Sequence, residues 1–303
     1  MPLSTSYSRS DAIARYTEIA DRLPAPLNPK EVDYAENLAD LADEFDVFVL
    51  DGFGVLNVGD RAIVGAVDRV AQLQRLGKKV MVLTNGATMP VRKTVAKYED
   101  WGFNFLAGDV ISSRDALEHG LKQQNPTLLW GVAATPDSAI EELAERVVLL
   151  EDEPDVYANV DAFIFLSASN WSDHRQRCLL DALAKQSRPV LVGNPDLVAP
   201  REDAMSMEPG FFSHALADAD VCKPIFFGKP FPLVFELVAK RISSVPPHRI
   251  AMVGDTLHTD ILGGSSFGWR TVLVKNHGLM RDANNLDTIQ TTGVRPHYIV
   301  ATT

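Results

Sequence analysis

The chain alternates short apolar runs with segments of helical periodicity, and several of the apolar runs end in a polar or charged residue. The clearest such ends are Asp51, Thr84 and Asp255. An apolar run of this length is typical of a strand buried on both faces of a parallel sheet. Because ligands of open parallel sheets bind at the carboxyl ends of the strands, we expect these side chains to share one crevice. The pattern predicts an α/β fold with a doubly wound, Rossmann-like parallel sheet.

The expected elements follow each other along most of the chain. Helices are predicted at Asn28–Phe45, Ala62–Gly77, Val91–Trp101, Ser138–Arg146 and Ser172–Lys185. Strands are predicted at Val47–Leu50, Lys79–Leu83, Thr127–Gly131, Val147–Leu150, Ala162–Leu166, Pro189–Gly193, Arg249–Val253 and Arg270–Val274, with a last strand at Tyr298–Ala301 closing a sheet edge.

The composition of the chain argues against some classes of binding partner. The 303 residues, 46% of them hydrophobic, suffice for one large or two smaller domains. The net charge of −11 argues against a nucleic-acid partner. We find no apolar signal-peptide core and no apolar run of about 20 residues, so we expect no membrane partner and a cytoplasmic location. Cys178 and Cys222 do not make a disulfide framework, although a single bond between them stays open.

Four segments carry the chemistry, and their order is informative. They are Phe48–Leu56, Val82–Gly86, Phe227–Pro230 and Met252–Asp260. Together and in this order they resemble the motifs of the haloacid dehalogenase superfamily of hydrolases. Within it the chain is similar to the NagD-like class, class IIA, whose members are mostly phosphatases. The resemblance extends from about Val47 to about Gly278.

The resemblance assigns roles to four charged residues. Asp51 would be the nucleophile that forms an aspartyl phosphate. Asp255 and Asp260 would hold Mg²⁺, which prefers hard oxygen ligands, although Asp260 could instead cap the following helix. Lys229, in a loop made stiff by Pro230, would neutralise Asp51 and the phosphoryl charge.

Further residues are expected to contact the substrate. Thr84, with the backbone N–H groups of Asn85 and Gly86, would bind the transferring phosphoryl oxygens. Asn194 and Asp196 resemble a loop of the inserted domain that helps to select the substrate, although Gly-Asn-Pro-Asp is also an ordinary turn.

The resemblance also predicts the domain organisation. Residues 1–114 would form the first part of the core with an N-terminal helical extension, 115–207 an inserted α/β cap, and 208–303 the second part of the core. The partner would be a small phosphorylated metabolite. Because caps of this class often pair, a homodimer is expected.

One position departs from the family pattern. Phosphatases of this superfamily carry a second aspartate two residues after the nucleophile, where it protonates the leaving alkoxide and then activates water. This chain has Phe53 there. Phenylalanine cannot transfer a proton, and a positioned acid–base group is typically worth about 10²–10⁴-fold in rate. The backbone carbonyl at this position is a metal ligand in the family, and Phe53 keeps it.

Three hypotheses follow from Phe53. The chain is a Mg²⁺-dependent phosphatase that favours good leaving groups or takes its acid from the cap or the substrate. Alternatively it is a carbon–halogen hydrolase, since the dehalogenase form of the motif has an aromatic residue at this position, although such enzymes need no Mg²⁺ and have smaller caps that are inserted earlier. In the third hypothesis it binds a phosphorylated ligand without turnover.

Overall fold

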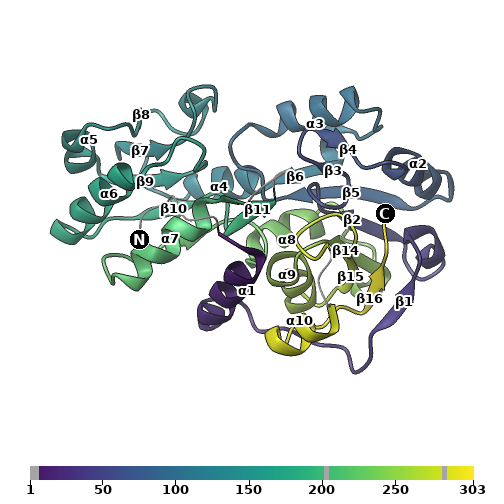
Figure 1. Cartoon of the computed structure of the whole chain (residues 1–303). Helices are drawn as coiled ribbons and strands as arrows, with labels where there is room; N and C mark the ends of the chain where they lie inside the picture. Colours follow the sequence, from purple (N-terminus) through teal and green to yellow (C-terminus); the bar gives the residue numbers. More distant parts are fainter. Residues whose placement is uncertain (1–6, 201–204, 282–284) are drawn as a thin grey trace.

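The computed structural model describes residues 7–200, 205–281 and 285–303 (Figure 1). Its larger sheet has seven strands in the order β1-β16-β15-β14-β2-β5-β6, and every pairing is parallel. The strands are β1 (Asp33–Ala35), β2 (Val47–Leu50), β5 (Lys79–Thr84), β6 (Val110–Ser112), β14 (Ile250–Gly254), β15 (Arg270–Val274) and β16 (Tyr298–Val300).

Helices cover both faces of this sheet, because successive side chains of each strand point to opposite faces. In β2, Val47 and Val49 face one apolar cluster, whereas Phe48 and Leu50 face the other. The first face is covered by α4 (Ser113–Leu121) and α8 (Pro232–Ala239), and the second by α2 (Ala66–Arg75) and α3 (Val91–Asp100). The predicted doubly wound α/β class is therefore confirmed.

A second parallel sheet has the strand order β13-β10-β9-β7-β8. Its strands are β7 (Trp130–Ala133), β8 (Val147–Leu149), β9 (Ala162–Phe165), β10 (Val190–Val192) and β13 (Ile225–Phe226), and α5 (Pro154–Asn159), α6 (Asp173–Lys185) and α7 (Pro209–Asp218) lie with it. We call this sheet and its helices the cap. The division at residues 115 and 207 stays a prediction, and the edge strand β13 comes from beyond it.

Short elements complete the described chain. They are the hairpins β3 (Asn57–Val58) with β4 (Arg61–Ala62) and β11 (Val198–Pro200) with β12 (Met205–Met207), the helices α1 (Arg9–Glu18), α9 (Leu262–Ser266) and α10 (Asn285–Thr292), a π-turn at Leu257–Ile261, and 3₁₀ turns at Ala20–Arg22, Leu38–Leu41, Ala107–Asp109, Ile140–Glu142 and Pro247–Arg249.

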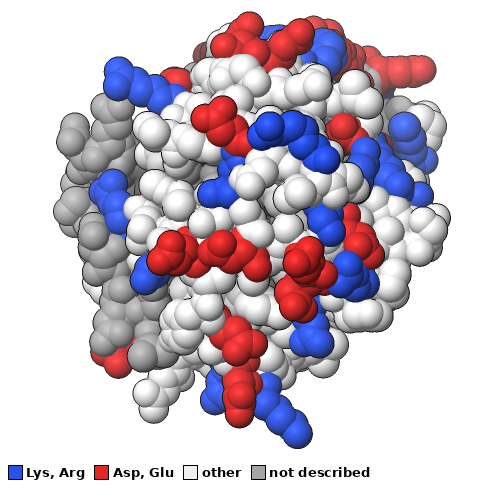
Figure 2. Space-filling model, turned by 90° about the vertical axis from the view of Figure 1, so that its right-hand side faces the viewer, with Lys and Arg blue, Asp and Glu red and all other residues white. Residues whose placement is uncertain are grey.

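The surface carries charges of both signs. On the face that Figure 2 shows, Lys and Arg side chains are interspersed with Asp and Glu, and no broad field of one sign covers it. Among the described residues, every helix is too short or too polar to span a bilayer.

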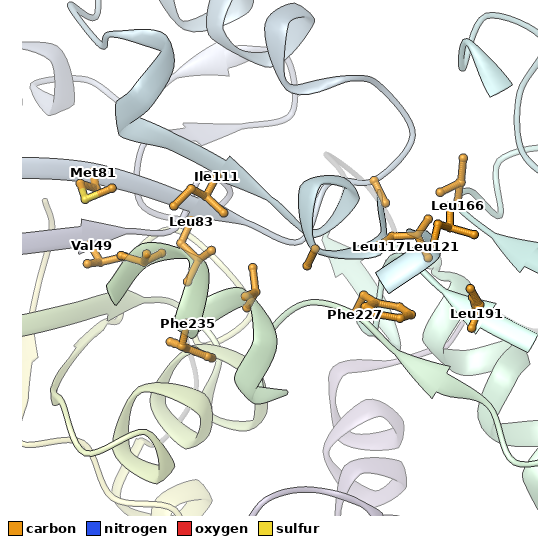
Figure 3. Close-up of a cluster of buried hydrophobic side chains, with 14 of the residues drawn as sticks. Val49, Met81, Leu83, Ile111, Leu117, Leu121, Leu166, Leu191, Phe227 and Phe235 are labelled. Atoms are coloured by element: carbon orange, nitrogen blue, oxygen red, sulfur yellow. The ribbon is translucent and has the colours of Figure 1, made fainter. Parts of the chain in front are cut away.

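The two sheets share one apolar core. Figure 3 shows it running from Leu83 and Ile111 of the larger sheet, past Leu117 of α4 and Phe227, to Leu191 of the cap. A Cβ on Gly120 would lie 2.2 Å from the Phe227 ring, so only glycine lets α4 pack this closely. Packed side chains, rather than an open linker, therefore join the cap to the larger sheet.

The predicted helix Asn28–Phe45 is wrong. The segment forms the edge strand β1, which pairs with β16, and then a 3₁₀ turn at Leu38–Leu41. The helical spacing did identify buried residues, because Leu38, Leu41 and Phe45 are all in the core. β1 lies outside β16, so the expected edge position of the last strand is also wrong.

The predicted helix Ser138–Arg146 is likewise wrong, since only the 3₁₀ turn Ile140–Glu142 forms there. The buried Arg114 guanidinium binds the carbonyls of Ser138 and Ala139, which a helix would direct to its own N–H groups. Two boundaries also move. α2 begins at Ala66, because Arg61 and Ala62 belong to the β3–β4 hairpin, and β7 begins at Trp130.

Helix α1 packs against the cap around Leu197 and against the segments that follow β14 and β15 (Figure 1). The Tyr16 ring stacks on His258 with centroids 4.5 Å apart, and its hydroxyl accepts a hydrogen bond of 3.2 Å from the Leu197 backbone N–H. Arg15 forms an ion pair with Asp218 of α7. The N-terminal helix therefore joins the segment around His258 to the cap.

We expect Tyr16→Phe to lower the free energy of unfolding by about 1–3 kcal/mol, because the buried Leu197 N–H loses its acceptor. Urea unfolding followed by fluorescence would measure the change. Tyr34→Phe is the matched control, since Tyr34 is 62% exposed and should change stability by less than about 0.5 kcal/mol. Equal effects of the two variants would contradict the role of α1.

Candidate active site

Two neighbouring strands place the first two carboxylates. β2 and β14 are paired in parallel, and the backbone N–H of Asp51 donates to the Val253 carbonyl at 2.8 Å. Asp51 and Asp255 therefore leave the sheet at the same edge, as the sequence predicted. Both side chains are largely buried, with residue exposures of 8% and 3%.

Lys229 is buried between two carboxylates. Its Nζ lies 2.5 Å from Asp51 Oδ1 and 2.7 Å from Asp260 Oδ1, and the residue is 1% exposed. The preceding Gly228 has a φ of +121°, and a Cβ there would lie 2.1 Å from Ser113 Oγ. The glycine is thus required for the loop to bring the lysine inside. The structure brings together three of the predicted charged residues that lie up to 209 positions apart.

Burial and mutual charge shift the pKa values in this cluster. Loss of hydration raises the pKa of Asp51 well above its usual value, and the Lys229 ammonium opposes that shift. Burial also raises the pKa of Asp255 to about 7, and the nearby Asp260 charge adds to the effect. Burial lowers the pKa of Lys229, but Asp260 and Asp51 outweigh it, so the net shift is upward and the lysine stays charged.

The cluster fits a divalent metal ion. Ligand atoms of Asp51, Asp255 and Asp260 all lie within 4.8 Å of one another. Carboxylate oxygens suit Mg²⁺, and a cation would offset the crowding of three buried acids. A Cβ on Gly54 would lie 2.5 Å from the Asp255 carboxyl carbon, so the backbone that carries Phe53 approaches this acid closely.

Asp260 also makes a contact typical of a helix cap, the alternative role that the sequence allowed. Its Oδ2 accepts a hydrogen bond of 3.1 Å from the Thr256 N–H, as a capping residue would do. A Cβ on Gly254 would lie 2.0 Å from its carboxyl carbon, so the glycine makes room for this acid. Oδ1, which faces Lys229, belongs to the charged cluster.

The segment after β5 supplies one hydroxyl and one structural amide. Thr84 ends β5, and its Oγ1 accepts a hydrogen bond of 3.1 Å from the Gly86 N–H. The Asn85 side chain donates to the Lys229 carbonyl and to Asp196, and it accepts from the Lys229 N–H and from Ser113. Asn85 therefore holds the lysine loop, and a substrate contact of its side chain stays a prediction.

The cap loop at Asn194–Asp196 reaches the same place. Asp196 Oδ1 accepts a hydrogen bond of 2.8 Å from Asn85 Nδ2, and the Asp196 N–H donates to Asn194 Oδ1. Asn194 Nδ2 in turn contacts Glu208 at 3.3 Å. Burial raises the pKa of Asp196 to about 7. The loop is an ordinary Asx turn, and it also forms part of the cavity wall.

A cavity of about 350 Å³ connects these residues, and Asp51, Phe53, Thr84 and Asp196 all line it. This volume fits a small metabolite. A larger cavity of about 660 Å³ lies elsewhere, between α7 and α8, but its walls are mostly apolar.

The sequence missed a further part of the cavity wall, which the side of α3 provides. Lys93, Thr94, Lys97 and Tyr98 line it there. Their spacing, at i, i+1, i+4 and i+5, is that of one helix face, but the sequence did not indicate which face would meet the cavity.

Comparison with known proteins identifies the fold and its family. The family model described as haloacid dehalogenase-like hydrolase matches residues 48–148, and a second, related model matches residues 226–302. The chain belongs to the haloacid dehalogenase-like hydrolases. A solved structure titled a putative NagD protein has the same fold, with a TM-score of 0.63, 23% identity and coverage of 77% and 89%, in agreement with the NagD-like class predicted from the motifs.

Relatives of this hydrolase are named as phosphatases. This chain is 25% identical over 260 residues to phosphoglycolate phosphatase 1A of Arabidopsis thaliana, and the alignment covers 79% of this chain and 71% of that protein. A possible sugar phosphatase from Cytophaga hutchinsonii has a similar solved structure, with a TM-score of 0.79, 23% identity and coverage of 90% and 98%. A glycerol phosphate phosphatase from Mycobacterium tuberculosis, solved in complex with calcium and in complex with magnesium, aligns with a TM-score of 0.66–0.67, 22–23% identity and coverage of 86% and 74–75%.

We expect Lys229→Met to lower the free energy of unfolding by about 3–5 kcal/mol, because it leaves buried carboxylates without their cation. Urea unfolding at pH 7 in the presence of a chelator would measure this. Mg²⁺ should restore part of the loss by replacing the missing positive charge.

Lys79→Met is the matched control for Lys229. Lys79 pairs with Asp109, but its side chain is 46% exposed, so its removal should cost no more than about 1 kcal/mol. Similar losses in the two variants would show that burial does not distinguish these ion pairs.

Asp196 should make stability depend on pH. Its pKa rises from 3.8 to about 7 on folding, so the folded protein binds more protons than the unfolded chain between these values. Its contribution is complete below about pH 4 and is lost as the pH rises to 7. Relative to Asp196→Asn, the wild type should therefore lose stability in this window, by at most about 1.4 kcal/mol per pH unit.

Urea unfolding at pH 5, 6 and 7 would compare the wild type with Asp196→Asn. The asparagine keeps an Oδ1 that can accept from Asn85, so the hydrogen bond is preserved. Parallel stability curves for the two proteins would show that Asp196 titrates normally.

Proposed function

We propose that this chain is a Mg²⁺-dependent phosphatase that hydrolyses a small phosphorylated metabolite through an aspartyl phosphate on Asp51. One observation carries the proposal. The cluster of Asp51, Lys229, Asp255 and Asp260 lies at one sheet edge, beside a cavity that Thr84 also lines. Its named relatives act on phosphoglycolate, sugar phosphates or glycerol phosphate, and these are all small phosphate monoesters.

Asp51, Lys229 and Thr84 each have a separate role in the first step, the transfer of the phosphoryl group to Asp51. The Asp51 carboxylate attacks phosphorus, the bond from phosphorus to the ester oxygen breaks, and the phosphoryl group passes to Asp51. Lys229 is already charged and desolvated beside Asp51, so it can stabilise the phosphoryl oxygens without reorganisation. Thr84 can donate its hydroxyl proton to the same oxygens, while its Oγ1 accepts from the Gly86 N–H.

Mg²⁺, held by Asp51, Asp255, Asp260 and the Phe53 carbonyl, would supply positive charge to the phosphoryl group. Lys229 links Asp51 to Asp260 and therefore keeps these two donors in place. Water attack on the aspartyl phosphate then returns the Asp51 carboxylate and releases phosphate.

The two other hypotheses predict different products. A carbon–halogen hydrolase would release halide without Mg²⁺, but the three crowded carboxylates of Asp51, Asp255 and Asp260 would then have only Lys229 to balance their charge. A binding protein would hold a phosphate ester tightly in the presence of Mg²⁺ without releasing phosphate, and Phe53 is the observation that favours it.

We expect the wild type to release phosphate from p-nitrophenyl phosphate with Mg²⁺ and not with a chelator. Asp51→Asn should lower kcat by about 10³-fold or more, because it removes the nucleophile. Circular dichroism would show that the variant remains folded. Normal turnover by Asp51→Asn would remove the nucleophile assignment, and no release by folded wild type would refute the phosphatase proposal.

A further inference from the structure

Phe53 leaves the proposed reaction without a proton donor at the usual position. The side chain lines the cavity but has no ionisable group. An alkyl phosphate ester needs a proton at its leaving oxygen, since an alkoxide is a poor leaving group. Another O–H group near Asp51 would therefore have to supply this proton.

Tyr98 presents such a group from α3. Its ring packs against Phe103 and Phe105, with centroids 5.9 and 5.7 Å away, and the residue is 4% exposed. It nevertheless lines the active-site cavity together with Asp51. The aromatic cluster thus fixes the ring, while the hydroxyl end reaches the site.

The hydroxyl lies against the residue that follows the nucleophile. A Cβ on Gly52 would lie 2.4 Å from the Tyr98 hydroxyl oxygen, 3.6 Å from Thr84 Oγ1 and 3.7 Å from Asn57 Oδ1. Three polar groups from separate elements therefore converge on the open side of Gly52. A larger residue at position 52 would displace the tyrosine, so the glycine and the hydroxyl fit each other.

Apart from Asp51, the charged side chains of the cavity already have partners. Asp196 accepts from Asn85 and Glu208 from Asn194, whereas Lys93 donates to the Asp137 carbonyl and Lys97 forms an ion pair with Asp60. Within the described residues, the Tyr98 hydroxyl has no hydrogen-bond partner. It can therefore donate to a bound substrate without breaking an existing contact.

We infer that Tyr98 is the catalytic acid and base that replaces the aspartate missing at position 53. This inference rests on the proposed phosphatase function. As the bond from phosphorus to the ester oxygen breaks, the leaving oxygen takes the Tyr98 proton, and a phenolate remains. In the second step water attacks the aspartyl phosphate, gives its proton to the phenolate, and the bond from phosphorus to Asp51 breaks.

The surroundings of Tyr98 agree with this cycle. Burial, together with the neighbouring Asp51 charge, raises the pKa of the Tyr98 phenol, so the group is protonated at neutral pH. Such a weak acid gives its proton efficiently only to a strong base. An alkoxide that develops on the leaving group is one, whereas a nitrophenolate is not.

Tyr98→Phe tests the assignment through the dependence on the leaving group. We expect kcat/KM for p-nitrophenyl phosphate to change by less than about threefold, because this leaving group needs no proton. For glycerol phosphate, whose leaving alkoxide is a strong base, kcat/KM should fall by about 10²-fold or more, and the loss for phenyl phosphate should lie between the two.

Tyr157→Phe is the matched control. Tyr157 is buried in the cap, where its hydroxyl donates to the Glu151 carbonyl, so its variant should keep the wild-type dependence on leaving group. Adding Phe53→Asp to Tyr98→Phe should restore hydrolysis of glycerol phosphate by at least about tenfold, because a carboxyl group returns to the usual position.

The outcomes separate the two proposals. If Tyr98→Phe hydrolyses all three esters like the wild type, the Tyr98 assignment is overturned and the phosphatase function stands. An equal loss on all three esters would also overturn it, since a structural role gives no dependence on the leaving group. If the wild type hydrolyses none of the esters, the phosphatase proposal and the Tyr98 assignment both fail.

Discussion

The ion pairs of Lys229 with Asp51 and Asp260 are the interaction on which the site depends. An ammonium and two carboxylates with almost no exposure to water are costly to bury, so each charge requires the others. Gly228 lets the lysine loop enter, and Asn85 holds that loop from both its N–H and its carbonyl. The same charges that favour phosphoryl transfer therefore also connect the strand ends of the larger sheet.

The cap is joined to this charged centre in two ways. On the apolar side, Leu117 and Phe227 continue the core of the larger sheet into the cap (Figure 3). On the polar side, Asp196 contacts Asn85, which in turn holds Lys229. A movement of the cap loop would therefore displace Asn85, and through it the backbone of Lys229. Such short coupling suits a site that has to select its substrate and exclude water during transfer.

The sequence predicted the features that follow from local pattern. Apolar runs gave the strands of the larger sheet, and the order of their polar ends placed Asp51, Thr84 and Asp255 at one edge. The sequence-based prediction was wrong where pairing with a distant segment of the chain determines the secondary structure. β1 forms because it pairs with β16, at the other end of the chain, and no pattern within Asn28–Phe45 shows that partner.

The same limit applies within the site. The use of the Asn85 side chain could not be predicted, because its partners lie 28, 111 and 144 residues away. Tyr98 was not singled out by the sequence, and in the structure its ring lies in an apolar cluster as a core residue would. Only the position of its hydroxyl beside Gly52 distinguishes it.

Helix α1 has a consequence for how the chain is divided in practice. The family models match from residue 48 onwards, so a fragment trimmed to that match would contain every proposed catalytic side chain. It would lack Tyr16, which stacks on His258 two residues before Asp260 and also binds the Leu197 N–H of the cap loop. A cut at the boundary of family similarity would therefore remove contacts that join the site to the cap, and a fragment that keeps the first helix would retain them.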